Sequence, residues 1–261
     1  MSKGIKIWNK VLSAVFQIPG VKVNRDSFLH EKLSIYCTGS QISLAIEKGT
    51  IGNIDEKVLD EIAKECIQSH TIKVTAISTA LGIPGGYTAI FGAIPGDLTQ
   101  YYYHVFVLSQ ELAYIYGYPD LCDENGNFSE SAKNLLTIFV GVMGGVVAAN
   151  KVIQEIAEQA QKQFIKRLPQ YPLTKGFLYP IVKQVVKWIA KKQLTKESYA
   201  RGISKIIPII GGVVSGGLTY ITFRPQAKRL MGKLKTTMVL AYENKKEEAF
   251  DSAEEVEDVS S

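Results

Sequence analysis

Residues 74–96 read VTAISTALGIPGGYTAIFGAIPG, a run of 23 residues without a charged side chain. A helical run of this length and apolarity is long enough to span a bilayer. The triplet Pro84-Gly85-Gly86 interrupts it and Pro95-Gly96 ends it, which favours two short helices joined by a turn over one straight span. The segment therefore predicts either hairpin-like helices that contact a membrane or tightly packed helices inside a bundle.

Two further stretches, residues 134–150 and 206–223, also lack charge and are rich in glycine. Glycines four apart lie on one face of a helix and let two backbones approach closely. Each costs about 1 kcal/mol relative to alanine in a helix, so a packing reason is needed. The four pairs with this spacing, which we predict to be helix-packing positions, are Gly82/Gly86, Gly92/Gly96, Gly141/Gly145 and Gly212/Gly216.

The rest of the chain has helical periodicity and no convincing strand alternation. Asp55 and Ser129 stand where N-caps are expected, and Gly117 stands where a helix would end. We predict an all-α fold: a single helical bundle with glycine-rich, tightly packed or hairpin-like apolar helices. Residues 1–25 are expected to hold an amphipathic helix, which either packs on the core or anchors at a membrane. Residues 26–242 form the helical domain, and residues 243–261 a disordered acidic tail.

The composition excludes several classes of protein. Of the 261 residues, 46% are hydrophobic and 21% charged, which excludes wholesale disorder and collagen-like sequence. The three cysteines and three histidines are scattered without metal-ligand spacing, and no phosphate-binding glycine motif occurs. We therefore predict no metal and no cofactor.

Charge is distributed unevenly along the chain. Residues 1–150 carry 11 basic and 14 acidic residues, residues 151–242 carry 17 and 3, and residues 243–261 carry 2 and 8. The net charges are −3, +14 and −6, which sum to the +5 of the whole chain. The charge distribution therefore says more about the surfaces and binding partners of this protein than about catalytic chemistry.

The basic region contains a candidate membrane-binding helix. Lys183, Lys187 and Lys191 are four apart, with Trp188 at the edge of the row. Lys205 and Arg224 bracket the third apolar stretch. Lysine rows beside apolar segments are typical of helices that bind anionic lipids. A solvated face is the alternative, and nucleic acid is disfavoured because no nucleic-acid motif is present.

A polar stripe lies on the aromatic segment 97–116. Asp97, His104 and Glu111 are seven apart, and Gln100 shares their side. Successive members would lie about 10.5 Å apart along a helix, too far for two of them to bind one metal ion. The stripe is either a pocket completed by other helices or a cap and two satisfied polar groups at a helix interface.

Three blocks together resemble the EcsC family of bacterial proteins. The first runs from Gly85 to Gly117 and includes Pro95-Gly96-Asp97 and Tyr116-Gly117. The others are Gly141-Val142-Met143-Gly144 and the run from Ile207-Pro208 to Gly216-Gly217. The resemblance covers about residues 30–240. It implies a helical, membrane-associated protein connected with an ABC transporter, and it carries no catalytic residue to this chain.

We therefore expect a non-enzymatic, membrane-associated bacterial accessory protein that assists a transporter or secretion system. Its expected location is the cytoplasm, at the inner face of the cell membrane, with anionic membrane lipids and a membrane transporter or another protein as partners. Two alternatives stay open: a membrane-perturbing or pore-forming effector, and a lipid-binding protein or enzyme with a pocket near Asp97, His104 and Glu111. The sequence leaves the oligomeric state open.

Overall fold

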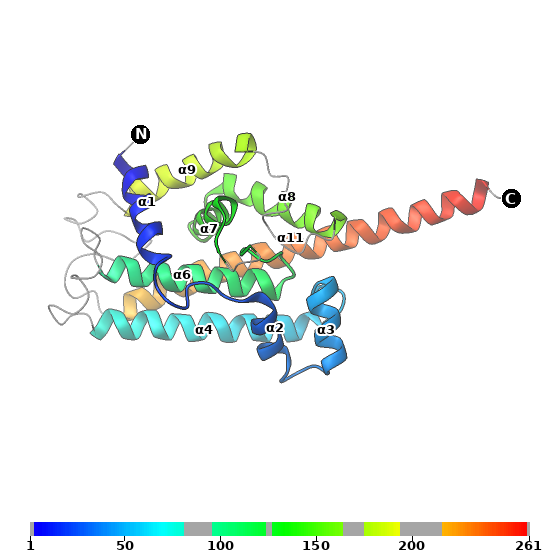
Figure 1. The fold of residues 1–261 in the computed structure, drawn as a ribbon, viewed down its shortest axis with the longest axis horizontal. Helices are drawn as coiled ribbons and strands as arrows, with labels where there is room; N and C mark the ends of the chain where they lie inside the picture. Colours follow the sequence, from blue (N-terminus) through cyan, green and yellow to red (C-terminus); the bar gives the residue numbers. More distant parts are fainter. Residues whose placement is uncertain (1–2, 81–95, 124–126, 164–174, 194–215, 260–261) are drawn as a thin grey trace.

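The computed structural model describes residues 3–80, 96–123, 127–163, 175–193 and 216–259 (Figure 1). Every regular element in these ranges is an α-helix, which confirms the predicted all-α class. The helices are α1 (Lys3–Val15), α2 (Arg25–Leu33), α3 (Gly39–Lys48), α4 (Glu56–Ala80), α6 (Gly96–Ile115), α7 (Glu130–Met143), α8 (Val147–Gln163), α9 (Lys175–Gln193) and α11 (Gly216–Val259).

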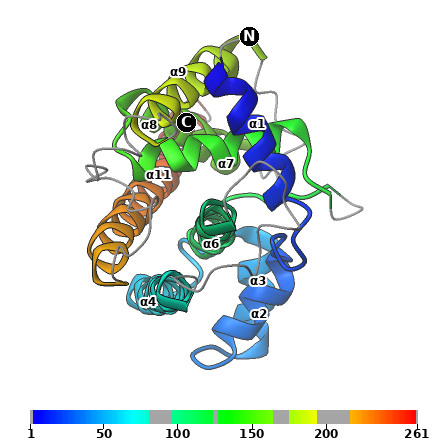
Figure 2. The same cartoon turned by 90° about the vertical axis from the view of Figure 1, so that its left-hand side faces the viewer.

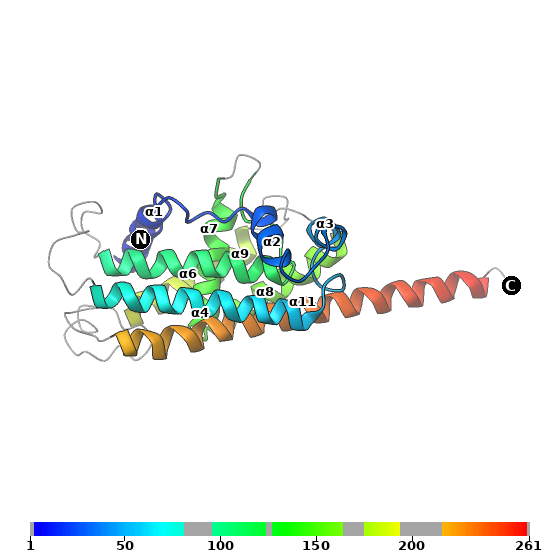
Figure 3. The same ribbon diagram turned by 90° about the horizontal axis from the view of Figure 1, so that it is seen from below.

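Three long helices run along the length of the molecule. Figure 3 shows α6, α4 and α11 lying side by side, and α4 contacts both of the others. Lys235 of α11 joins α11 to α4, because its Nζ lies 2.9 Å from Oδ2 of Asp60 and 3.1 Å from Oε2 of Glu56. The helices α1, α7, α8 and α9 form the other side of the molecule, where α7 contacts α8 and α9, and α9 contacts α1 (Figure 2).

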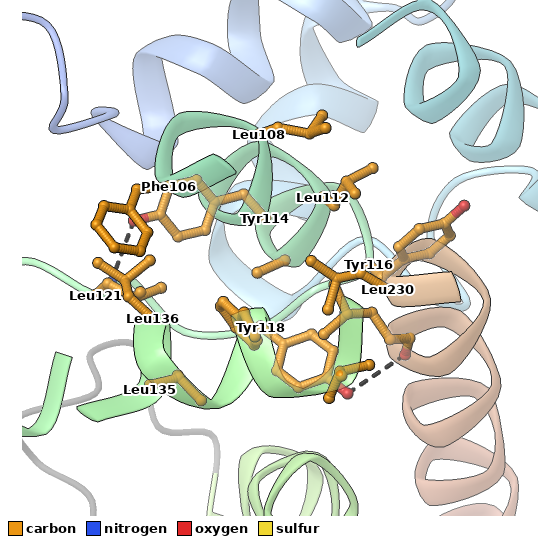
Figure 4. Close-up of a cluster of buried hydrophobic side chains, with 14 of the residues drawn as sticks. Phe106, Leu108, Leu112, Tyr114, Tyr116, Tyr118, Leu121, Leu135, Leu136 and Leu230 are labelled. Atoms are coloured by element: carbon orange, nitrogen blue, oxygen red, sulfur yellow. Dashed lines mark hydrogen bonds between the residues drawn. The ribbon is translucent and has the colours of Figure 1, made fainter. Parts of the chain in front are cut away.

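The core is built around the aromatic face of α6 and the turn that follows it. Tyr114, Tyr116 and Tyr118 are fully buried and pack among leucines of α6, α7 and α11 (Figure 4). Their hydroxyls are satisfied inside the protein: that of Tyr118, for example, lies 2.6 Å from Oγ1 of Thr237. These tyrosines are therefore core residues.

The N-terminal helix belongs to the same bundle. Trp8 is buried, and its Nε1 donates to Oγ1 of Thr137 on α7 at 3.1 Å. Of the two predictions for this segment, packing on the core is the one that the structure shows. Lys6 and Lys10 lie on the opposite, exposed side of α1.

Tight packing at glycine occurs where α7 crosses α9. A Cβ placed on Gly141 would lie 2.6 Å from Cγ2 of Val185, and one on Gly144 would lie 2.1 Å from Cη2 of Trp188. Gly145, which we predicted to pack with Gly141, has another role. Its φ of +80° and the bond from Val146 N–H to the Gly141 carbonyl at 2.8 Å make it the left-handed residue that ends α7.

The remaining predicted packing glycines have no described surroundings. Gly96 and Gly216 begin α6 and α11, and nothing around them is described. Gly82, Gly86, Gly92 and Gly212 lie outside the described residues. Among the described helices, none has a stretch both long and apolar enough to cross a bilayer.

The prediction of a disordered tail is wrong in the structure. Helix α11 continues without a break to Val259, past the end of the bundle (Figure 1). Lysine, glutamate and alanine are good helix formers, so a helix already fixed by the bundle propagates into this segment at little cost. The composition excluded a packed core for these residues, but it did not exclude a helix.

The contact at Gly141 gives a test of the α7–α9 crossing. Gly141→Ala should lower the free energy of unfolding by about 1–3 kcal/mol, because Val185 is too short and stiff to move aside. Gly232→Ala is the matched control in α11, where an added Cβ meets nothing within 4 Å. It should stabilise by about 0.5–1 kcal/mol. Urea unfolding of both variants measures these changes. Equal changes in the free energy of unfolding would contradict the tight crossing of α7 and α9.

Candidate functional site

A chain of polar side chains lies buried between α4 and α6. His104 is 4% exposed and His70, which faces it from α4, is 5% exposed. Gln100 and Glu111 stand one turn before and two turns after His104 on α6. The helix pairing therefore brings Gln100, His104 and Glu111 together with a second histidine, which the sequence analysis had treated as isolated.

The chain is hydrogen-bonded from Gln100 through His104 to His70 and ends in a close contact with Glu111. Nε2 of Gln100 lies 3.0 Å from Nε2 of His104, and Nδ1 of His104 lies 3.0 Å from Nδ1 of His70. At the other end, Nε2 of His70 lies 3.2 Å from Oε2 of Glu111. This last contact is close but poorly aligned, so Oε2 has no hydrogen-bond partner among the described residues.

One assignment of protons satisfies the two hydrogen bonds that join Gln100, His104 and His70. If the amide N–H of Gln100 donates to Nε2 of His104, then Nδ1–H of His104 donates to Nδ1 of His70. His70 then carries its proton on Nε2, directed toward the carboxylate of Glu111. Both rings are neutral in this arrangement, and the only charge is on the carboxylate.

The surroundings keep His104 uncharged. Burial, followed by the neighbouring His70 and Lys73, lowers the pKa of His104 to about 3. Burial and the Glu111 carboxylate raise the pKa of the Cys66 thiol, which is therefore not a thiolate near neutral pH. The ionisable groups around the pair are Cys66 and Lys73 on α4, Tyr103 and Glu111 on α6, and Lys32 on α2.

In the described part of the chain, no group of three or more histidine, cysteine or acidic side chains could hold a metal ion. The two rings fill the helix interface and satisfy one another. The side chain of Asp97 lies outside the described residues, so the fourth predicted member of the pocket is not placed.

The second candidate is a basic surface formed by two neighbouring helices, α1 and α9. The side chains of Lys6 and Lys10 on α1 and of Lys183 and Lys187 on α9 are all exposed. The two helices contact each other although about 170 residues separate them in the sequence (Figure 2). We call this surface the α1–α9 face.

The α1–α9 face contains lysine and no acidic residue. Helix α1 has three lysines and α9 has five, and neither contains Asp or Glu. None of its four exposed lysines forms an ion pair with a described acidic residue, in contrast to Lys235 on α11. Lys183 and Lys187 on α9 were predicted as membrane-binding residues, whereas α1 was predicted only to pack on the core or to anchor at a membrane, with no link to α9.

The other predicted membrane-binding residues are placed differently. Trp188 is half-buried, and its ring covers Gly144 of α7, so it packs into the bundle instead of standing at the edge of the lysine row. Arg224 is exposed on α11, which packs chiefly on α4 and α8. Lys191 lies on α9 but its side chain is not described, and Lys205 lies outside the described residues.

Comparisons with known proteins give no relative: no family model, no curated protein and no solved structure matches the chain. The similarity to the EcsC family therefore stays a prediction.

The buried histidine makes stability depend on pH. The pKa of His104 is about 6.5 in the unfolded chain and about 3 in the folded protein. The free energy of unfolding therefore contains the full contribution of His104 above pH 6.5 and loses it as the pH falls toward 3. His104→Gln should cost about 1–3 kcal/mol at pH 7, because it disrupts the chain to His70. This cost should shrink by about 1 kcal/mol for each pH unit below 6.

The measurement is urea unfolding of wild type and variant from pH 7 to pH 4. His30→Gln is the control, because His30 is exposed and its replacement should change stability little at any pH. A His104→Gln penalty that is the same at pH 7 and pH 5 would show that His104 is not held neutral by burial.

Proposed function

We propose that this chain is a non-enzymatic, membrane-associated bacterial accessory protein. It binds the anionic cytoplasmic surface of the cell membrane through the α1–α9 face and assists a transporter or secretion system there. The observation that carries the proposal is that two helices distant in sequence lie side by side with eight lysines and no acidic residue.

Unpaired exposed lysines are suited to a surface of lipid headgroups. Each lysine near an anionic bilayer contributes about 1 kcal/mol, so the four exposed lysines of the face would supply about 4 kcal/mol. Lysine is a compact, hydrated point charge that does not require the fixed geometry of a bidentate site. A fluid anionic surface is therefore a better match than a single shaped ligand.

Charge is the main source of the proposed affinity. Because the ring of Trp188 is held against Gly144, it does not supply an aromatic anchor. Tyr179, which is 65% exposed on α9, is the large apolar side chain available on this face. Binding should therefore be reversible and sensitive to salt, as expected of a peripheral membrane protein.

The buried histidine chain favours a non-enzymatic role. Its two rings are engaged with each other, with Gln100 and with Glu111, and the neighbouring Cys66 thiol is protonated. A general base or nucleophile needs a free reacting atom within reach of a substrate. The alternative enzyme or lipid-binding pocket near Asp97, His104 and Glu111 has no such support.

Vesicle binding tests the proposal. The variant Lys6→Gln/Lys10→Gln/Lys183→Gln/Lys187→Gln should bind phosphatidylglycerol-containing vesicles about a hundredfold to a thousandfold more weakly than wild type. Raising the salt concentration should weaken wild type much more than the variant. Co-sedimentation with vesicles of graded phosphatidylglycerol content measures both effects.

The matched control removes four exposed lysines from other helices: Lys48, Lys57, Lys64 and Lys151, each replaced by Gln. It lowers the net charge equally, so it should retain most of the binding if the α1–α9 face is the site. Equal losses of vesicle binding in the two variants would show that net charge alone, and not the α1–α9 face, causes the binding. The proposal is contradicted if wild type binds vesicles equally well whatever their lipid charge, or if it binds duplex DNA more tightly than vesicles. Leakage of vesicle contents would favour the membrane-perturbing alternative.

A further inference from the structure

A small cavity lies where the start of α2, the end of α3, the turn after α6 and the end of α8 meet. Its wall includes Arg25, Lys48, Gly117 and Gln161, and its volume is about 40 Å³. A water needs about 10–15 Å³ of such a volume, so the cavity has room for about three waters or one small polar group. Helices α2 and α3 lie on the opposite side of α6 from α9, so this site is separate from the α1–α9 face (Figures 1 and 2). We call it the Arg25 cavity.

Arg25 brings a buried charge to this cavity. Its side chain is only 9% exposed, although it opens α2 at the positive end of the helix dipole, where a cation is disfavoured. Both of its hydrogen bonds start from Nη1, which donates to Oδ1 of Asp26 at 3.0 Å and to the carbonyl of Ile46 at 3.1 Å. Nε is buried and has no hydrogen-bond partner among the described residues. A buried donor of a charged group is costly when it is left unpaired, so the Nε side of the guanidinium needs an acceptor.

The packing of the helices accounts for Nη1 but not for Nε. The Ile46 carbonyl lies in the last turn of α3, so it has no partner within that helix, and the helix dipole favours a cation beside it. Asp26 is 66% exposed and engages the same nitrogen. Nε and Nη2 form the other edge of the guanidinium, and neither donates to a residue that the structure describes. That edge is therefore available to a ligand.

The charge of the wall favours an anion. Arg25 and Lys48 are cationic and Glu47 is anionic, which leaves one net positive charge among the lining residues. Glu47 and Lys48 are both exposed whereas Arg25 is buried, so a positive charge lies on the inside. A monoanion matches this wall better than the dianion of phosphate, which Glu47 would repel more strongly.

We propose that the Arg25 cavity binds a small carboxylate, which accepts hydrogen bonds from Nε and Nη2 of Arg25. The two N–H groups of a guanidinium edge are parallel and match the two oxygens of a carboxylate, and such charge-assisted pairs are among the stronger hydrogen bonds in proteins. The cavity admits a carboxylate group and little else, so its occupant is an ion of about the size of acetate. The site does not depend on the proposed membrane function.

Titration of the full, isotope-labelled chain with sodium acetate tests the proposal by NMR spectroscopy. The Nε–H signal of Arg25, identified by its loss in Arg25→Lys, should shift and saturate at millimolar acetate, as should the amide signals of Gly49 and Gly117 in the wall. Sodium chloride at the same ionic strength should leave these signals in place. Arg25→Lys keeps the charge but lacks the fixed pair of N–H donors, so its amide signals should report an acetate affinity at least about tenfold lower.

Two variants at the rim separate binding from folding. Glu47→Gln should tighten acetate binding and Lys48→Gln should weaken it, each by about twofold to fivefold, because one removes a repulsion and the other an attraction at exposed positions. Opposite changes from neighbouring residues cannot come from a loss of folding. Lys151→Gln is the control and should bind acetate as wild type does, since Lys151 is exposed on α8 nearly three turns before Gln161.

Three results would each overturn the proposal. They are signals that do not saturate with acetate, an unchanged acetate affinity in Arg25→Lys, and tighter binding of inorganic phosphate than of acetate. The titration contains no vesicles, and none of the substituted residues lies on the α1–α9 face. This test and the vesicle test therefore fail separately.

Discussion

Helix α6 is enclosed on nearly every side, and each polar group that it carries therefore needs a partner inside the protein. Gln110 bonds the segment that follows α1, His104 meets His70 of α4, and Tyr118, just after the helix, meets Thr237 of α11. These bonds fix the position of α6 along three different neighbours. Apolar packing alone would tolerate sliding by a turn, but a buried unpaired polar group would not.

Local features of the fold could be predicted from the sequence because they depend on a few adjacent residues. Ser129 caps α7 through its side chain, and Gly117 has the positive φ of a helix-ending glycine, as predicted. Gly145 shows the limit of spacing rules. Four residues separate it from Gly141, but the helix ends between them, so only Gly141 reaches the crossing with α9.

The candidate sites were predicted only in part, since each combines residues from distant helices. The spacing on α6 selected Gln100, His104 and Glu111. Nothing local linked them to His70, although it continues the apolar stripe of α4 one turn beyond Cys66. The α1 half of the basic face could not be predicted in the same way, because α1 is brought beside α9 by its packing on the core through Trp8, Val11 and Val15.

Folding gives no reason for the uniform charge of the α1–α9 face. A surface that only meets water is served as well by mixed charges, which add favourable pairs along a helix. Lys183 and Lys187 repel each other on α9, and Lys6 and Lys10 repeat the arrangement on α1. Eight acidic residues instead lie within residues 243–259, at the far end of α11 (Figure 1). The proposed binding to anionic lipid would give the uniform charge of the α1–α9 face a reason that folding alone does not supply.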